Sequence, residues 1–154
     1  MASFAPTRRH VIGSGLATLA ALALAPRQAL AAIERIVFDD LYGKISVLGL
    51  SFSDKAKALA GQSVEMRGFM APPLKAEAKF FVLTEIPMSL CPFCSSDADW
   101  PANIVVVYLR EAQTFEQANK VIEVSGRFEI GSWTDPETGF VSLVRIVDAS
   151  FRTV

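Results

Sequence analysis

The chain of 154 residues contains several short runs in which apolar residues alternate with polar ones or follow one another directly. Alternation over residues 63–70 and 122–130 predicts two strands, each with one buried face and one face in water. On this pattern Glu123 belongs to the wet face of the second strand. Residues 80–84 and 104–109 are apolar throughout, which predicts central strands covered on both faces.

Turn and capping signals complete the expected set of elements. Residues 135–139 read Asp-Pro-Glu-Thr-Gly, a turn sequence, and predict a hairpin whose second strand covers residues 140–147. Residues 53–61 predict a helix of at most two turns, with Ser53 as its cap and Gly61 as its stop.

Five expected strands and a small helical part indicate a mainly β domain, built either as a small barrel or as a sandwich. Gly68 and Gly126 occupy similar positions within two of the strands, each followed within two residues by a phenylalanine. A glycine inside a strand permits the sharp coiling that closes a small barrel, so we favour the barrel. The alternative is that both glycines are ordinary bulges, which suits a sandwich equally well.

Residues 1–31 have the features of a cleavable export signal. Arg8 and Arg9 precede an apolar run over residues 11–25, and Ala29-Leu30-Ala31 forms a small-residue cleavage signal. The paired arginines resemble the twin-arginine type of signal, and a general secretory signal is the alternative. We expect cleavage before Ala32, a periplasmic domain over residues 32–154, and no stable membrane insertion after cleavage, since the apolar run is too short to span a bilayer.

Loss of this leader changes the charge of the chain. Of the 15 lysines and arginines, three lie in the leader, so 12 remain against 16 acidic side chains, a net charge near −4. That sign argues against binding to nucleic acid or anionic lipid, since both favour basic surfaces. Cations, neutral ligands and other proteins are left as possible partners.

The single histidine, His10, belongs to the leader, so the exported domain contains none. This excludes serine-histidine-aspartate catalysis, histidine zinc hydrolysis and a histidine general base, and favours a protein that is not an enzyme. The neighbouring acids Asp39 and Asp40 are typical of a surface pair. Three aromatic residues could line a ligand groove, although aromatics in a small barrel more often lie in the core or at its rim: Trp100, Tyr108 and Trp133.

Cys91 and Cys94, the only cysteines, are separated by two residues. This spacing is compatible with a local disulfide, a redox pair or half of a metal site. A disulfide suits an oxidising compartment. The redox interpretation is weaker, because the short stretch before Pro101 leaves no room for a thioredoxin-like helix and nearby acids disfavour a thiolate.

A metal site is the second use of the cysteine pair. Asp97 and Asp99 could complete four ligands for zinc with the two thiolates, and Met70 or Met88 could join the cysteines around copper(I), which favours soft sulfur ligands. Met66 and Met70 share a strand face with Val64 and are more typical of core packing.

Several short motifs resemble exported, OB-like bacterial domains of unknown function that often occur with transporter components. They are residues 61–64 (Gly-Gln-Ser-Val), residues 68–72 (Gly-Phe-Met-Ala-Pro), residues 80–83 (Phe-Phe-Val-Leu) and the cysteine segment before Ile104. The similarity covers about residues 59–150. It implies a five-stranded OB-like barrel and an accessory role beside a protein partner such as a transporter component.

We therefore expect an exported, non-enzymatic binding module with a surface cysteine loop, serving a transport system. The first alternative is a protein that binds zinc or copper through Cys91 and Cys94, and the second is a thiol-disulfide redox protein.

Overall fold

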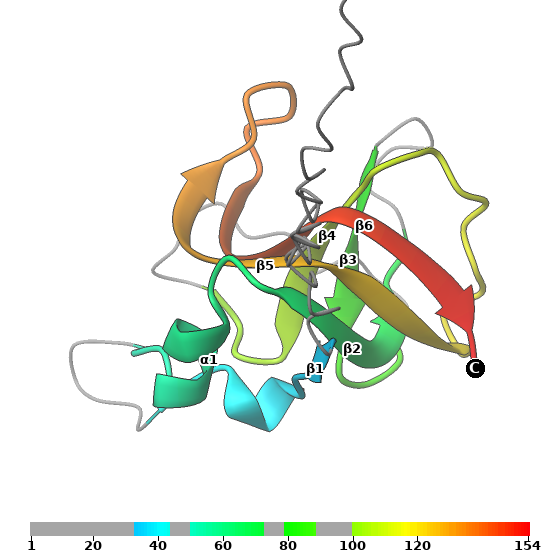
Figure 1. Cartoon of the computed structure of the whole chain (residues 1–154). Helices are drawn as coiled ribbons and strands as arrows, with labels where there is room; N and C mark the ends of the chain where they lie inside the picture. Colours follow the sequence, from blue (N-terminus) through cyan, green and yellow to red (C-terminus); the bar gives the residue numbers. More distant parts are fainter. Residues whose placement is uncertain (1–32, 44–49, 73–78, 89–99) are drawn as a thin grey trace, which may run out of the picture. The chain divides into compact units, whose positions relative to one another are not determined.

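The computed structural model describes residues 33–43, 50–72, 79–88 and 100–154, which belong to one compact unit that spans Ala31–Val154 (Figure 1). The described residues of this unit are mainly β and form one sheet of six strands, one α-helix and one 3-10 helix. The elements, in chain order, are β1 (Glu34–Arg35), η1 (Phe38–Asp40), α1 (Asp54–Leu59), β2 (Ser63–Met70), β3 (Phe80–Thr84), β4 (Ile104–Leu109), β5 (Val121–Thr134) and β6 (Val141–Thr153).

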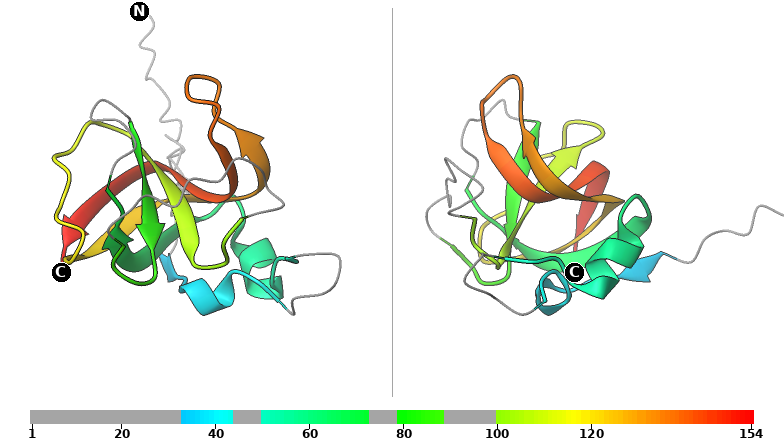
Figure 2. Two further views of the ribbon diagram at one scale, coloured as in Figure 1. Left: turned by 180° about the vertical axis from the view of Figure 1, so that it is seen from behind. Right: turned by 90° about the vertical axis from the view of Figure 1, so that its left-hand side faces the viewer.

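The strand order in the sheet is β1-β2-β3-β4-β6-β5, and β5 also pairs with β2. Strand β2 therefore pairs with three strands, β1, β3 and β5, and each of the strands from β3 to β6 has two neighbours in the sheet. Figures 1 and 2 show this arrangement of the strands. The β1–β2 and β4–β6 pairs are parallel, and the remaining pairs are antiparallel.

The expected mainly β class is confirmed, and several elements have the expected bounds. Strands β2, β3 and β4 cover the residues that the hydrophobic pattern predicts. Burial alternates along β2, whereas all of β3 and the first four residues of β4 are buried. Helix α1 begins after Ser53, whose hydroxyl oxygen accepts a hydrogen bond of 2.9 Å from the Ala56 amide, so the expected cap is also confirmed.

Two expectations about β5 and β6 need correction. Both strands are longer than their patterns predict, because they pair with each other over most of their length. Glu123 does not face water, since only 1% of the residue is exposed. Arginines on neighbouring strands cover its carboxylate, and a pattern within one strand carries no information about them.

The core occupies the inner side of the sheet and contains aliphatic and aromatic side chains from every strand from β2 to β6. Met66 and Met70 belong to it, with exposures of 0% and 1%. Gly126 lies where β5 passes closely over β6: a Cβ there would lie 2.6 Å from the Ile146 Cγ2 atom and 2.8 Å from the Val147 carbonyl oxygen. Only glycine fits this contact without a shift of the backbone.

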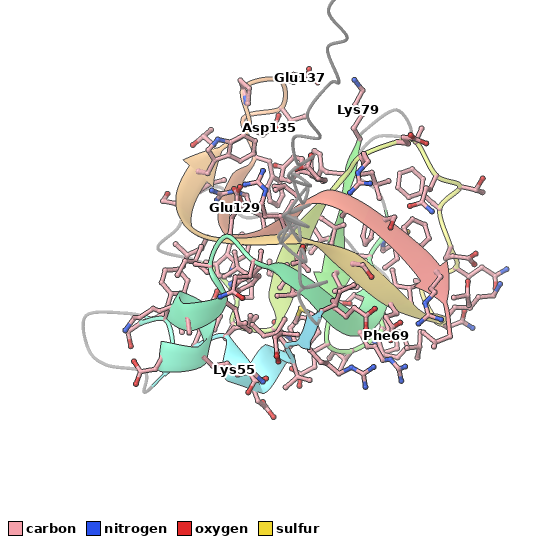
Figure 3. The ribbon with its side chains drawn as sticks, in the orientation of Figure 1. Lys55, Phe69, Lys79, Glu129, Asp135 and Glu137 are labelled. Atoms are coloured by element: carbon pink, nitrogen blue, oxygen red, sulfur yellow. The ribbon has the colours of Figure 1, made fainter. Side chains whose placement is uncertain are left out.

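The predicted β5–β6 hairpin is present, and Asp135 organises its turn. The Asp135 Oδ1 atom accepts hydrogen bonds from the amides of Glu137 and Thr138 at 3.0 and 2.8 Å. Figure 3 shows Asp135 and Glu137 at the tip of this hairpin. Across the described part of the chain, no helix has both the length and the apolar character that a membrane span requires.

Candidate functional site

A small pocket lies where β3 ends and β4 begins. Its volume is about 200 Å³. The lining comes from three stretches of chain that are distant in sequence: Phe38, Asp39, Tyr42, Gly43, Leu50, Glu85, Ala102 and Asn103. The pocket therefore brings η1 and the residues after it beside the two strand ends.

Hydrogen bonds between the strand ends position Glu85 at the pocket. The Thr84 hydroxyl, which is buried, donates to the Ile86 carbonyl oxygen at 2.7 Å and so fixes the turn of the chain after β3. The Glu85 amide donates to the Asn103 carbonyl oxygen at 3.2 Å, just before β4 begins. Glu85 and Asn103 are thus held together by backbone pairing, while the Glu85 side chain stays exposed.

The adjacent acids of η1 have different surroundings. Asp40 accepts hydrogen bonds from the Val37 amide at 3.1 Å and from the Lys55 ammonium at 2.6 Å (Figure 3 labels Lys55). Burial raises the pKa of Asp40, but the bonds from Lys55 and Val37 outweigh it and hold this pKa below its ordinary value. Asp39, in contrast, is exposed and lines the pocket.

The segment after η1 also contributes to the pocket lining. Tyr42 forms an isolated antiparallel bridge with Phe52, and their rings stack with centroids 5.8 Å apart. The Gly43 amide donates to the Ser51 carbonyl oxygen at 2.8 Å, which ties the next turn of chain to the stretch before α1. Tyr42, held by the bridge and the stack with Phe52, contributes an aromatic ring to the pocket lining, and Phe38 contributes the second.

The lining combines two carboxylates, one side-chain amide and two aromatic rings, so it favours a cationic group over an anionic one. Carboxylate and amide oxygens accept hydrogen bonds from ammonium or guanidinium groups, and aromatic faces attract cations. The volume is below the range of about 300–1,000 Å³ that is typical of pockets for drug-sized ligands. A single basic side chain or a small hydrated cation matches it better.

Of the metal, thiol and signal residues expected from the sequence, only Met70 and Met88 lie in the part of the chain that the structure describes, and neither is among the residues that line this pocket. Met88 is half-buried, and Met70 belongs to the core. The others lie outside the described residues: Cys91, Cys94, Asp97, Asp99 and the leader residues Arg8, Arg9, Ala29 and Ala31. Within the described ranges there is no group of three or more histidine, cysteine, aspartate or glutamate side chains arranged to hold a metal ion.

Sequence reasoning missed Asp39, Glu85 and Asn103 as a group. The signal that could have found two of them is the position of Glu85 directly after the apolar run 80–84 and of Asn103 directly before the run 104–109. Because these strands pair antiparallel, the end of one meets the start of the other. Asp39 has no comparable signal, since its approach to Glu85 depends on tertiary folding.

The aromatic residues that could have lined a groove have other roles. Tyr108 and Trp133 pack edge to face with centroids 5.2 Å apart, and the Arg145 guanidinium lies 5.3 Å from the Trp133 ring centroid. Burial, with the nearby charge of Asp135, raises the pKa of Tyr108 above its ordinary value of 10.0. Trp100 is only 4% exposed and belongs to the core.

Comparison with known proteins identifies a similar fold but no family. No protein-family model matches the chain, and no curated protein matches it. Among solved structures, a DUF3299 family protein from Pseudomonas aeruginosa PAO1 is similar, with a TM-score of 0.54 and 13% sequence identity. The match covers 80% of this chain and 97% of the other. At this identity the likeness concerns the fold alone.

Proposed function

We propose that this protein is an exported, non-enzymatic binding module whose pocket at the ends of β3 and β4 receives a cationic group. The observation that carries the proposal is that Asp39, Glu85 and Asn103 line one pocket of about 200 Å³ together with two aromatic residues. Such a pocket suits one basic side chain of a partner protein. The resemblance to domains that occur with transporter components is the reason for proposing a transport system as the partner.

The proposal includes a five-stranded OB-like barrel formed by the strands from β2 to β6. Its support is the sequence of pairings, which runs β2-β3-β4-β6-β5 and returns to β2, with a parallel β4–β6 pair. It also includes export to the periplasm, supported by Arg8, Arg9 and the Ala29-Leu30-Ala31 signal, with the domain beginning at Ala32.

Metal binding is the second candidate function, and one observation favours it. The segment that carries Cys91 and Cys94 connects β3 to β4 in the sequence, and the pocket at the ends of these strands contains the carboxylates of Asp39 and Glu85. Zinc accepts thiolate and carboxylate ligands together, whereas copper(I) favours the sulfur atoms. A thiol-disulfide role for the cysteine pair is the third candidate.

The cysteine chemistry is tested by intact mass, thiol counting and metal analysis of protein purified from the periplasm without chelators. A loss of two mass units against the reduced chain, with no metal, supports the binding module with a disulfide. Stoichiometric zinc or copper that disappears in the Cys91→Ala/Cys94→Ala variant supports the metal-binding function instead. Turnover of a defined substrate that the same variant loses would contradict the non-enzymatic proposal.

The pocket is tested by NMR titration of the ¹⁵N-labelled protein with arginine methyl ester. We expect concentration-dependent amide shifts at Asp39, Glu85 and Asn103, and at least a severalfold weaker response in Glu85→Gln, because one charged acceptor is lost. Glu137→Gln is the matched control, since Glu137 is an exposed glutamate in the hairpin turn, outside the pocket lining. Equal titration curves for the two variants, or no shifts in the pocket, would refute the proposed cation site.

A further inference from the structure

Three arginines surround a buried glutamate on the outer face of the sheet. We call this group, made of Arg35, Arg67, Arg152 and Glu123, the arginine patch. The register explains how it forms: Arg67 on β2 lies directly opposite Glu123 on β5, and Arg152 on β6 lies opposite Glu123 from the other side. Arg35 reaches the same carboxylate from β1, which pairs with β2.

The contacts within the patch all converge on one carboxylate. The Arg67 Nε atom lies 2.7 Å from the Glu123 Oε2 atom, and the Arg35 Nη2 atom lies 3.5 Å from the same oxygen. Arg152 donates from Nη2 to the Oε1 atom. The bond from Arg67, helped by Arg152, holds the pKa of Glu123 below its ordinary value. The carboxylate is therefore ionised and anchors three guanidinium groups.

Exposure shows which charge the patch presents to its surroundings. The Glu123 side chain is 0% exposed, whereas those of Arg35, Arg67 and Arg152 are 56%, 47% and 68% exposed. Glu65, whose carboxylate lies 4.0 Å from Arg35, is 25% exposed and leaves the group with a net charge of +1. Since the negative charge of Glu123 is covered, the accessible surface is mainly guanidinium.

The guanidinium groups keep hydrogen-bonding capacity. Among the hydrogen bonds between described residues, Arg67 uses only its Nε atom and Arg152 only one Nη atom. A guanidinium carries five N–H donors in a rigid fork that matches a carboxylate. Because Glu123 already holds these side chains in place, a ligand would lose less conformational entropy in ordering them.

An apolar row lies beside the patch. Phe69 is two residues beyond Arg67 on the same face of β2, and it pairs with Val121 on β5. The amide of Val154 donates to the Val121 carbonyl oxygen at 3.1 Å, and these two valines are 54% and 37% exposed, respectively. Figure 3 shows Phe69 at this end of the sheet, near the C-terminus.

We propose that the arginine patch and its apolar row form the docking surface for an acidic segment of a protein partner, in which carboxylates alternate with apolar residues. This inference rests on the proposed function as a binding module and adds the chemistry of the partner at a second surface. Charge complementarity favours a short peptide segment. A long polyanion or an anionic membrane would extend beyond the arginine patch. The net negative charge of the exported domain would repel either of them.

The probe is a short fluorescein-labelled peptide in which glutamates alternate with leucine and phenylalanine, and binding is measured by fluorescence anisotropy. We expect the Arg67→Gln/Arg152→Gln variant to bind about tenfold more weakly or worse, because charge-assisted bonds are lost. Arg127→Gln, which removes an exposed, ion-paired arginine from β5 outside the patch, is the matched control and should bind as the unmodified protein does.

A second variant separates docking from folding. Glu123→Gln keeps all three arginines and a side-chain oxygen that still accepts hydrogen bonds from them, while it removes the negative charge beneath them. The gain in net positive charge offsets the weaker hold on the arginines, so we expect this variant to bind the peptide at least as tightly as the unmodified protein, even if it is less stable. Equal binding by the arginine variant and Arg127→Gln would overturn the proposal. Equal binding of a control peptide, in which glutamines replace the glutamates, would also overturn it. The same holds if the protein binds phosphatidylglycerol vesicles in an arginine-dependent way but does not bind the peptide. The NMR titration of the pocket uses a cationic probe and reports on other residues. The proposed cation site and the proposed docking surface can therefore fail independently of each other.

Discussion

The two halves of β5 contain the same kinds of residues in different surroundings. Residues 121–127 pair with β2 on one side and β6 on the other, whereas residues 129–134 pair, among the described strands, with β6 alone. Glu123 in the first half and Glu129 in the second each contact arginines, yet their side chains are 0% and 26% exposed. Within β5, the carboxylate that is fully buried is therefore the one flanked by a strand on both sides.

The glycines of β5 show the same contrast. A Cβ at Gly126, in the half that is paired on both sides, would overlap with atoms of Ile146 and Val147. A Cβ at Gly131, in the other half, would meet nothing within 4 Å, although its φ of +108° is unfavourable for other residues. Close packing restricts the first position, and only the backbone conformation restricts the second.

The largest expected difference comes from these glycines. Gly126→Ala should lower the free energy of unfolding by about 3 kcal/mol, since the added methyl group meets backbone atoms that cannot move freely. Gly131→Ala should cost about 1 kcal/mol, because only the positive φ opposes it. Urea denaturation of both variants measures the difference. A cost for Gly131→Ala equal to or above that for Gly126→Ala would contradict the contrast between the two halves.

The next difference concerns the glutamates. Glu123→Gln should shift the urea midpoint roughly twice as far as Glu129→Gln, because the Glu123 carboxylate is fully buried and contacts three arginines, whereas that of Glu129 is partly exposed and contacts two. Both substitutions preserve side-chain shape, so the comparison isolates the charge. If the two midpoints shift equally, burial and the number of arginines do not decide the strength of these ion pairs.

The smallest expected effect is on the pH dependence of stability. The Arg67 bond lowers the pKa of Glu123 from its ordinary 4.5, so its contribution is fully present above that value and is lost as pH falls through the lower folded pKa. Acidification should therefore destabilise the unmodified protein slightly more than Glu123→Gln. Urea midpoints measured from neutral pH to about pH 3 test this. A curve for Glu123→Gln that runs parallel to that of the unmodified protein would show that Glu123 does not titrate as described.

The candidate site was less accessible to sequence reasoning than the fold was. Residues 80–84 and 104–109 predicted two buried strands, and their antiparallel pairing brings Glu85 beside Asn103. The approach of Asp39 could not be predicted in this way. It depends on η1 packing beside strand ends that follow it by more than 40 residues in the chain.

The sequence by itself determined the mainly β class, the bounds of three strands, the cap of α1 and the β5–β6 turn. Each of these depends on residues close together in the chain, through alternation, apolar runs or a side-chain bond to a nearby amide. Tertiary structure alone decided that Glu123 is buried, since its partner Arg67 lies 56 residues away and meets it only in the register of β2 and β5. The register of two paired strands decides which side chains lie opposite each other. The pattern of residues along one strand does not reveal that register.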